Sequence, residues 1–389
     1  MFEHVETYPG DPILSLMDDY QRDPRTDKVN LSIGFYYDDA GQVPVLGSVR
    51  QARALLDTRA ESANLYLPMD GLPDFRRAVQ GYLFAEADCE RIVTLQSVGG
   101  SGALRVGADF LKRYYPDSQV WVSDPTWDNH LAIFQGAGFA VNRYPYLDGS
   151  GQQVDFPAML EVFARLPANS IVLLHACCHN PTGVDLQPQH WDALYALFHE
   201  RRLIPFLDAA YLGLGQGLDE DAYAIRALAR AGITGLVSNS FSKVFSLYGE
   251  RVGSLSVVCD NVAIAARVAG QLKGTVRTNY SNPPRHGAQL VATIFANSEL
   301  SALWRSELDG MRERMLAMRR ALFERIEPGL EVGYLLRQRG MFSYTGLSAE
   351  AVDRIREKHG VYLIRSGRMC VAGLNSSNLD AVARALSDH

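Results

Sequence analysis

The sequence has no run of apolar residues close to the roughly 20 that a bilayer-spanning helix needs. Its N-terminus also lacks the apolar segment of a signal peptide. Only five cysteines are present, an odd number that outlines no disulfide framework and favours a reducing compartment. Lys and Arg number 38 against 44 Asp and Glu, and the net charge of −6 gives no sign of a nucleic-acid or anionic-membrane partner. We therefore expect a cytoplasmic protein that binds neither nucleic acid nor membrane.

Internal repeats and low-complexity tracts are absent as well, and 47% hydrophobic with 21% charged residues is the composition of a globular protein. A chain of 389 residues exceeds what one small core organises, so we expect two domains. The sequence predicts an N-terminal arm over residues 1–12 and a large domain over residues 44–309. Residues 13–43 and 310–389 are expected to form a small domain together.

Segments with the apolar patterns of strands and helices alternate across residues 90–260, which predicts an α/β fold with a mostly parallel sheet and helices on both faces. Ligands of such sheets bind outside the carboxyl ends of the strands. The residues at or just beyond these predicted ends are Gly99–Gly102, Trp127, Asn180, Asp208, Tyr211 and Lys243. Their convergence predicts one ligand site at this edge of the sheet.

Lys243 differs from a solvated helical lysine because no aspartate or glutamate lies three or four residues away. A lysine held among apolar groups has a lowered pKa, and its free amine can form a Schiff base with a carbonyl group. Ser240, Ser242 and Arg251 could bind a phosphate close to it. This pattern indicates pyridoxal phosphate, a phosphorylated aldehyde. The alternative is that Lys243 only caps a loop between a strand and a helix.

Two further features bear on that cofactor. Gly99-Gly-Ser-Gly102 separates a predicted strand, residues 91–98, from a helix predicted to begin at Ala103, which is a geometry that presents backbone N–H groups to an anion. The segment lacks the G-x-G-x-x-G spacing of dinucleotide sites and the lysine of a nucleotide-binding P-loop. Asp208 ends an apolar run, where a carboxylate is costly unless it meets a cation such as a protonated pyridine nitrogen. The alternative is a turn or N-cap aspartate.

The stretch His175-Ala-Cys177-Cys178-His179 has residues that could bind zinc. Structural zinc sites space their cysteines by two to four residues, whereas adjacent cysteines on a strand point in opposite directions. We therefore expect no metal, and interpret Asn180-Pro-Thr-Gly183 as a sharp turn that aims the Asn180 amide at a ligand. No serine, histidine and acid occur in an order that favours a hydrolase. Arg277 and Arg368 are candidates for binding a carboxylate bidentately.

These residues together make the chain resemble the class I aminotransferases, the aspartate and aromatic branch of the fold-type I pyridoxal-phosphate enzymes. The resemblance runs essentially end to end and is greatest to the bacterial tyrosine, or aromatic-amino-acid, aminotransferases. It implies a large domain with a mostly parallel seven-stranded sheet and a smaller α/β domain. Its specific motifs are Ser238-Asn-Ser-Phe-Ser-Lys243 with Arg251, His179-Asn-Pro-Thr-Gly183, Asp208-Ala-Ala-Tyr211, Asn279-Tyr-Ser-Asn-Pro-Pro284 and Ser366-Gly-Arg368.

The resemblance implies a role for each residue that would bind the cofactor. Lys243 would form a Schiff base with pyridoxal phosphate and then carry protons, and Asp208 would pair with the pyridinium nitrogen. Asn180 and Tyr211 would hydrogen-bond the phenolic oxygen, while Trp127 would stack on the ring. The groups that hold the phosphate would be Gly100, Ser101, Ser240 and Arg251, with Tyr66 reaching it from the neighbouring subunit of a homodimer with shared active sites.

The resemblance also implies the substrate contacts. Arg368 would bind the α-carboxylate beside a backbone contact from Gly34, and Arg277 of the neighbouring subunit would meet the distal carboxylate of a dicarboxylic substrate. Side-chain contacts would come from Tyr37, Leu65, Asn180 and Trp127. The aromatic branch is matched at Phe35, Tyr37, Val43, Leu65 and Ser101, whereas Asn282 and Leu212 depart from its pattern.

The implied activity is transfer of the amino group of tyrosine or phenylalanine, and of aspartate, to 2-oxoglutarate by a ping-pong mechanism. The substrates would be small amino acids and 2-oxo acids. Three alternatives remain open. These are an aspartate aminotransferase as the main activity, another reaction on the same fold such as a β-decarboxylase or a lyase, and a protein that binds the cofactor without catalysis.

Overall fold

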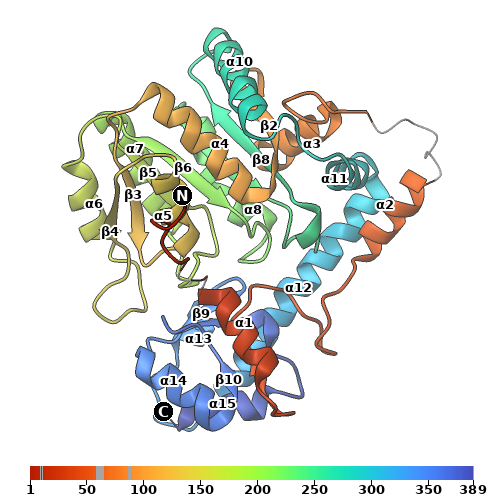
Figure 1. The fold of residues 1–389 in the computed structure, drawn as a ribbon, viewed down its shortest axis with the longest axis vertical. Coiled ribbons are helices and arrows are strands. Elements are labelled where there is room, and N and C mark those ends of the chain that lie inside the picture. The colour runs from red at the N-terminus through yellow and green to blue at the C-terminus, as the bar shows by residue number, and fades with distance from the viewer. Residues whose placement is uncertain (9, 11, 58–64, 86–88, 389) are drawn as a thin grey trace. The chain divides into compact units, whose positions relative to one another are not determined.

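The computed structural model describes residues 1–8, 10, 12–57, 65–85 and 89–388 (Figure 1). Its contacts divide the chain into two compact units, one formed by Pro44–Glu313 and the other by Met1–Val43 with Arg314–His389. Pro9 and Asp11 of the expected N-terminal arm lie outside the described residues.

The Pro44–Glu313 unit is built on a seven-stranded sheet with the order β2-β8-β7-β6-β5-β3-β4. All neighbouring pairs are parallel except those of β8, which runs antiparallel to both β2 and β7. The mostly parallel sheet expected from the sequence is thereby confirmed. Its strands are β2 (Ile92–Val98), β3 (Val120–Asp124), β4 (Val141–Pro145), β5 (Ile171–His175), β6 (Ile204–Ala209), β7 (Gly235–Ser240) and β8 (Val252–Val258).

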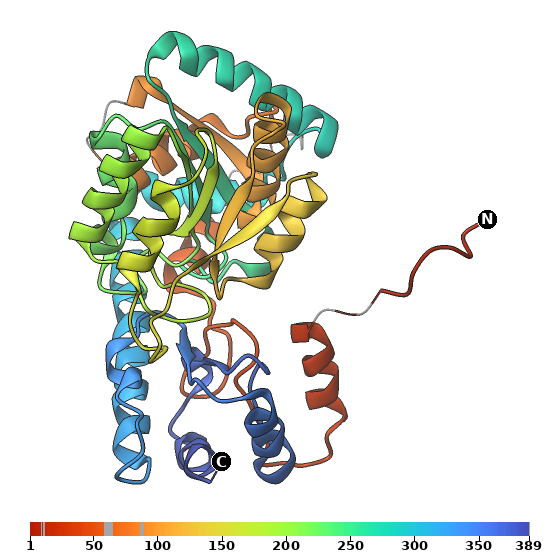
Figure 2. The same ribbon diagram turned by 90° about the vertical axis from the view of Figure 1, so that its left-hand side faces the viewer.

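Helices cover both faces of this sheet (Figures 1 and 2). One group comprises α4, which packs on β2, β7 and β8, together with α5 and α10, which contact α4. The helices of this unit are α2 (Gly47–Asp57), α3 (Pro73–Phe84), α4 (Gly99–Tyr114), α5 (Asp128–Gly136), α6 (Phe156–Ala164), α7 (Pro188–Arg201), α8 (Leu218–Asp221), α9 (Tyr223–Arg230), α10 (Val262–Asn279), α11 (His286–Ala296) and the first part of α12 (Ser298–Arg325), with short 3-10 helices η1 (Cys89–Arg91) and η2 (Tyr248–Glu250).

One hydrophobic core of the unit lies between the sheet and the group formed by α4, α5 and α10. Phe134 of α5 and Phe206 of β6 are fully buried there and meet edge to face at 5.8 Å. Helix α4 approaches the strands closely because position 107 is glycine, where a Cβ atom would lie 2.5 Å from the Phe206 ring. Burying such aromatic and aliphatic side chains is the main favourable contribution to folding.

Helix α4 begins at Gly99, not at Ala103 as the sequence predicted. The backbone N–H groups of the first helical turn make no intrahelical hydrogen bonds. A conformation at Gly99 that differs from the helical one therefore breaks no bond of the helix. Gly99 has a φ of +66°, which glycine adopts without strain, and its N–H donates to the carbonyl oxygen of Arg251 at 2.9 Å. The glycine segment is therefore the first turn of the helix itself.

The other unit has its own core and two small sheets. Strand β1 (Val29–Asn30) pairs in parallel with β10 (Val361–Tyr362), and β9 (Phe342–Tyr344) pairs antiparallel with β11 (Arg368–Cys370). Strand β1 ends at Asn30, whose side chain accepts the N–H of Ser32 at 2.9 Å and so competes with the ladder. The helices are α1 (Pro12–Arg22), α13 (Tyr334–Arg337), α14 (Ala349–His359), α15 (Leu379–Ser387) and the last part of α12, with the 3-10 helix η3 (Val371–Gly373).

The expected start of the small domain, residue 310, falls within helix α12, and the structure divides the units between Glu313 and Arg314 in the same helix. Among the described residues, no helix combines the length and the apolar character needed to cross a membrane.

Candidate active site

The candidate residues of the Pro44–Glu313 unit lie at one edge of the sheet. Strands β3, β5, β6 and β7 are parallel, and β2 runs in their direction because both β2 and β7 are antiparallel to β8. Their carboxyl ends therefore meet at the edge where β8 begins. This arrangement brings to one edge Gly99 after β2, His175 at the end of β5, Asp208 in β6, Ser240 at the end of β7, Lys243 just beyond it and Arg251 before β8.

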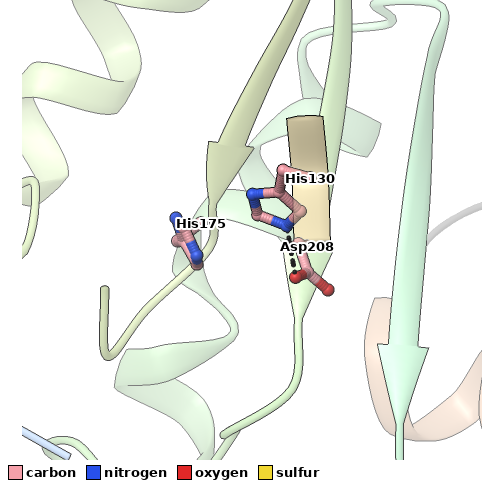
Figure 3. Close-up of side chains that lie close together, drawn as sticks. All are labelled: His130, His175 and Asp208. Carbon is pink, nitrogen blue, oxygen red and sulfur yellow. Dashed lines mark hydrogen bonds and ion pairs between the residues drawn. The ribbon is translucent and has the colours of Figure 1, made fainter. Parts of the chain in front are cut away.

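Asp208 is held by a chain of hydrogen bonds through a histidine (Figure 3). Asp208 is 6% exposed, and its Oδ2 lies 3.0 Å from Nε2 of His130, whose Nδ1 lies 2.9 Å from Oγ1 of Thr126. A carboxylate can only accept, so His130 donates from Nε2 to Oδ2 of Asp208, and the Thr126 hydroxyl donates to Nδ1 when the imidazole is neutral. His130 thus fixes the direction of the carboxylate.

The charge of Asp208 is favoured despite its burial. Burial by itself would raise its pKa, but the hydrogen bond from His130 and the nearby His130, His175 and Lys243 side chains bring the pKa below its ordinary value. His175 behaves differently, since burial lowers its pKa to about 3 and keeps its imidazole neutral. The Asp208 carboxylate is therefore ionised and held in one direction at the carboxyl end of β6.

Lys243 lies in the turn that follows β7 and is half-buried. Its Nζ is 5.5 Å from the centre of the Tyr211 ring, and its charge acts on Asp208. Tyr211 is 5% exposed and Asn180 is also buried. The ring of Trp127 meets that of His130 edge to face at 5.2 Å. Lys243, Asp208 and Tyr211 thus form one cluster, with Trp127 connected to it through His130.

A small polar cradle lies beside this cluster at the start of α4. The Ser238 hydroxyl donates to the carbonyl oxygen of Gly100 at 3.2 Å, and a Cβ atom at Gly100 would lie 3.1 Å from that of Ser240. Arg251 donates to the Ser242 hydroxyl at 3.3 Å, and a Cβ atom at Gly99 would lie 2.5 Å from its guanidinium. The cradle therefore combines the start of a 16-residue helix with the hydroxyls of Ser238 and Ser242 and the guanidinium of Arg251. Such a set of hydrogen-bond donors suits a phosphate. Ser101, also in this turn, is half-buried.

Three other candidates of this unit are exposed. Tyr66 is 90% exposed and Leu65 is 71% exposed, and both precede α3. Arg277, near the end of α10, is exposed and donates to the Ser281 hydroxyl at 2.5 Å. The structure therefore does not assemble these three residues into the buried cluster of the same chain.

The remaining candidates belong to the other unit and form a compact group there. Arg368 is buried, donates from Nη2 to the carbonyl oxygen of Ser32 at 2.7 Å, and places its guanidinium 4.4 Å from the centre of the Phe342 ring. Gly34 is next to the same ring, since a Cβ atom there would lie 2.9 Å from Phe342. Tyr37 is half-buried and donates its N–H to the carbonyl oxygen of Ala372 at 3.2 Å.

The prediction that Cys177 and Cys178 point in opposite directions is wrong. Their sulfur atoms and a carboxylate oxygen of Asp221 all lie within 4.8 Å of one another. Strand β5 ends at His175, so strand alternation no longer applies, and Cys178 has a φ of +50°. A hydrogen bond with Cys178, together with burial, raises the pKa of the Cys177 thiol well above its ordinary value, and Asp221 accepts three backbone N–H groups.

Sequence reasoning missed His130 and Thr126, and it considered His175 only as a possible zinc ligand. His130 lies inside α5 and reaches Asp208 only because that helix packs on the sheet, and nothing in its local sequence signals the contact. The spacing of Thr126 and His130, four residues apart, could have indicated that they face each other, but not what they orient.

The described residues fit pyridoxal phosphate. A buried carboxylate whose pKa is lowered suits a protonated pyridine nitrogen, the cradle at the start of α4 suits the phosphate, and Lys243 lies at the same edge. The side-chain Nε2 of His175 is buried and has no hydrogen-bond partner among the described residues, and the centre of its ring lies 5.0 Å from that of His130.

Comparison with known proteins agrees with this chemistry. Tyrosine aminotransferase of Klebsiella pneumoniae is 58% identical over 392 residues, covering 99% of both chains, and aspartate aminotransferase of Pseudomonas aeruginosa is 46% identical, covering 99% of this chain and 98% of the relative. The crystal structure of an aromatic-amino-acid aminotransferase from Burkholderia pseudomallei, covalently bound to pyridoxal phosphate, superposes with a TM-score of 0.97 at 46% identity, covering 100% of this chain and 98% of that one. The model of the family "Aminotransferase class I and II" matches residues 26–386, and the chain belongs to this family of pyridoxal-phosphate-dependent transaminases.

Proposed function

We propose that this transaminase moves the amino group of tyrosine or phenylalanine, and of aspartate, to 2-oxoglutarate. The observation that carries the proposal is the buried, ionised Asp208 at the same sheet edge as Lys243 and the phosphate cradle. A fixed carboxylate under the ring nitrogen is what amino-group transfer needs from the protein, because it keeps that nitrogen protonated. The name of the Klebsiella relative supports the choice of aromatic substrates.

The residues of the cluster divide the work of holding the cofactor. Asp208 would pair with the pyridine nitrogen, while Asn180 and Tyr211 would donate hydrogen bonds to the phenolic oxygen. Trp127 would cover one face of the ring. The phosphate would lie among the residues that surround the first turn of α4, namely Gly100, Ser101, Ser240 and Arg251, and would favour that position because helix N-termini attract anions.

Lys243 would act as both the attachment point and the proton carrier. When bound, pyridoxal phosphate supplies an electron-withdrawing ring that stabilises negative charge at the substrate α-carbon. The Nζ atom of Lys243 would accept the proton of that α-carbon and hold it close to the substrate. Asp208 stays ionised throughout because His130 donates to it.

Substrate orientation would come from a bidentate arginine. Arg368 would bind the α-carboxylate, and its guanidinium is already oriented by Ser32 and by the Phe342 ring. Gly34 would add a backbone contact, and the side-chain pocket would include Tyr37, Leu65, Asn180 and Trp127. Arg277 would bind the second carboxylate of aspartate or 2-oxoglutarate. An aspartate aminotransferase as the main activity is the second candidate, which Asn282 favours because it departs from the aromatic pattern.

The chain would act as a homodimer in which Tyr66 and Arg277 serve the partner's site. The exposure of Tyr66, Leu65 and Arg277 in a single chain supports this arrangement. Mixing Lys243→Ala and Tyr66→Ala subunits tests it, since each hybrid dimer would contain one site with neither change. We expect about a quarter of the wild-type activity after random exchange, because half of the dimers are hybrid and have one intact site of two. Activity no higher than the sum of the two parent variants would contradict shared sites.

We further propose that the protein works in the cytoplasm. All five cysteines are free in the structure, and four of them are buried, which suits a reducing compartment.

The test of the activity is a single half-reaction. Tyrosine, added without an oxo acid, should convert the absorption band of the lysine-bound cofactor to the shorter-wavelength band of the aminated cofactor and release one 2-oxo acid with the carbon skeleton of tyrosine. Repeating the experiment with aspartate ranks the two candidate activities. Loss of carbon dioxide or cleavage of the side chain would instead indicate a decarboxylase or a lyase. An unchanged spectrum with both amino acids would overturn the proposal.

A further inference from the structure

The turn after β5, residues 177–185, contains Asn180, and one carboxylate in it binds two of its backbone N–H groups. Asp185 accepts the backbone N–H of Cys178 on Oδ2 and that of His179 on Oδ1, both at 2.8 Å. Successive N–H groups that point toward one anion form a small anion-binding concavity known as a nest. Here the anion is part of the same turn, seven residues after the first of the two groups.

These two backbone bonds stabilise a conformation that the chain would otherwise disfavour. Cys178 has a φ of +50°, a region that residues other than glycine adopt at a cost. Cys178 and His179 are both buried, so their N–H groups would lack water if Asp185 were absent. The carboxylate therefore determines the direction in which the backbone enters Asn180.

The ring of His179 fixes the same turn from a second direction. The Oγ atom of Ser123, in β3, lies 2.9 Å from Nε2 of His179, and the Oγ1 atom of Thr182 lies 2.8 Å from its Nδ1. The ring also stacks on Tyr146 with a centre-to-centre distance of 3.9 Å and an angle of 13°. Burial, and then the neighbouring His175 and His130, lower its pKa well below the ordinary value, so the ring is neutral with one donor and one acceptor. Both ring nitrogens of His179 therefore have a hydroxyl as hydrogen-bond partner.

Further bonds close the turn on itself. Tyr146 donates its hydroxyl to the carbonyl oxygen of Val184 at 2.7 Å, and the N–H of Gly183 donates to the carbonyl oxygen of His179 at 2.7 Å. The N–H of Val184 donates to the Thr182 hydroxyl at 3.1 Å. Asn180 is thus preceded and followed by backbone with fixed hydrogen bonds, on an element that would otherwise be an irregular loop.

We infer that Asp185 and His179 are positioning residues for Asn180, and that they set the strength of its hydrogen bond to the phenolic oxygen of the cofactor. The inference rests on the proposed role of Asn180 in cofactor binding. A hydrogen bond to the charged form of a group lowers its pKa. The pKa of the lysine-bound cofactor, read from its visible absorption, therefore reports how well the Asn180 amide is aimed.

Asp185→Asn tests this directly, because it keeps one acceptor oxygen and opposes the second N–H with an amide NH2 group. We expect the spectroscopic pKa of the lysine-bound cofactor to rise by about half to one pH unit. The affinity of the apoprotein for pyridoxal phosphate, measured by equilibrium titration, should fall in parallel. His179→Gln, which retains a donor and an acceptor but loses the stack on Tyr146, should shift the pKa less and in the same direction. It also serves as the second variant if Asp185→Asn does not fold.

Asp148→Asn is the matched control. Asp148 also accepts two successive backbone N–H groups, those of Gln152 and Gln153 at 3.3 and 3.4 Å, but its turn carries no proposed cofactor residue. This variant should leave the spectroscopic pKa unchanged even if it melts at a lower temperature.

A double-mutant cycle with Asn180→Ala separates the possible outcomes. If Asp185 acts through Asn180, Asp185→Asn should add no shift in the Asn180→Ala background. A lower melting temperature with an unchanged spectroscopic pKa, or a shift that persists without Asn180, would overturn the inference while leaving the proposed function intact. If Asn180→Ala alone leaves the spectrum unchanged, the proposed role of Asn180 is wrong, and the inference fails with it.

Discussion

Two tyrosines proposed to contact the same cofactor have opposite environments. Tyr211 is 5% exposed and lies beside Lys243, whereas Tyr66 is 90% exposed and precedes α3. The same contrast separates Asp208, which is buried and bonded to His130, from the exposed Arg277. The buried residues contact one another within one chain. The exposed residues are proposed to serve the site of a partner subunit, so the two sets should respond differently to substitution.

Lys243→Ala should have the largest effect, because it removes the only group proposed both to attach the cofactor and to move the proton. We expect turnover of tyrosine with 2-oxoglutarate to fall by on the order of 10⁴-fold or more, while noncovalent cofactor binding persists. The steady-state rate and the cofactor content after gel filtration measure the two effects.

Lys112→Ala is the control for Lys243→Ala. Lys112 lies on α4 in the same unit, with its Nζ 4.9 Å from the Phe139 ring, and its removal should leave turnover near the wild-type rate. Near-normal turnover of Lys243→Ala would show that Lys243 is not needed for catalysis and would contradict the proposed mechanism.

Asp208→Asn should have the next largest effect, because a neutral amide cannot keep the pyridine nitrogen protonated. Loss of one preorganised electrostatic contact typically costs about 10²–10³-fold in rate, and we expect that range for kcat with tyrosine. His130→Gln should cost less, since the carboxylate remains and only its orientation weakens. Equal activity of Asp208→Asn and His130→Gln would contradict the expectation that the charge of the Asp208 carboxylate matters more than its orientation by His130.

Much of the fold was predictable because the apolar spacing is regular where a segment packs on one face. Strand β2, residues 92–98, begins and ends within one residue of the strand predicted over residues 91–98, and Asp208 lies near the end of β6, as its place at the end of an apolar run predicted. The start of α4 was not predicted, because glycines in the first turn of a helix add nothing to its apolar periodicity.

The grouping of residues at the carboxyl-end edge of the sheet was predictable from topology. The contacts that hold these residues in place, such as that of His130, were not. Parallel strands bring their carboxyl ends together, so residues far apart in the sequence, such as Asp208 and Lys243, could be grouped from strand ends alone. His130 approaches from a helix through tertiary packing, and the two thiols of Cys177 and Cys178 converge because the strand has already ended. Both depend on three-dimensional geometry that residue spacing does not contain.

Arg277→Leu should separate the exposed set from the buried edge. A charged hydrogen-bonded pair contributes roughly 1.5–3 kcal/mol, which corresponds to about 10- to 150-fold in kcat/KM for aspartate. The value for tyrosine, which has no second carboxylate, should change little. Arg267→Leu, at another exposed arginine of α10, is the control and should affect neither substrate. Equal losses for both substrates would mean that Arg277 supports the fold or the subunit contact and does not select the substrate.

The smallest expected effect contrasts a buried histidine with an exposed one through the pH dependence of stability. Burial lowers the pKa of His175 to about 3 from an unfolded value of 6.5. Between these values the unfolded chain binds one more proton than the folded chain, so the free energy of unfolding falls as the pH is lowered from 6.5 toward 3. The slope from this residue approaches about 1.4 kcal/mol per pH unit.

His175→Gln should remove that slope, whereas the same change at the exposed His199 should not. Urea denaturation of the apoprotein between pH 5 and pH 7 measures it, because the cofactor then contributes nothing to the difference. The variant can be less stable than the wild type at pH 7 and still meet the expectation, since the prediction concerns the change with pH. An identical pH dependence for wild type and His175→Gln would mean that His175 takes up its proton in the folded protein, and the buried edge would then be more open to water than its packing indicates.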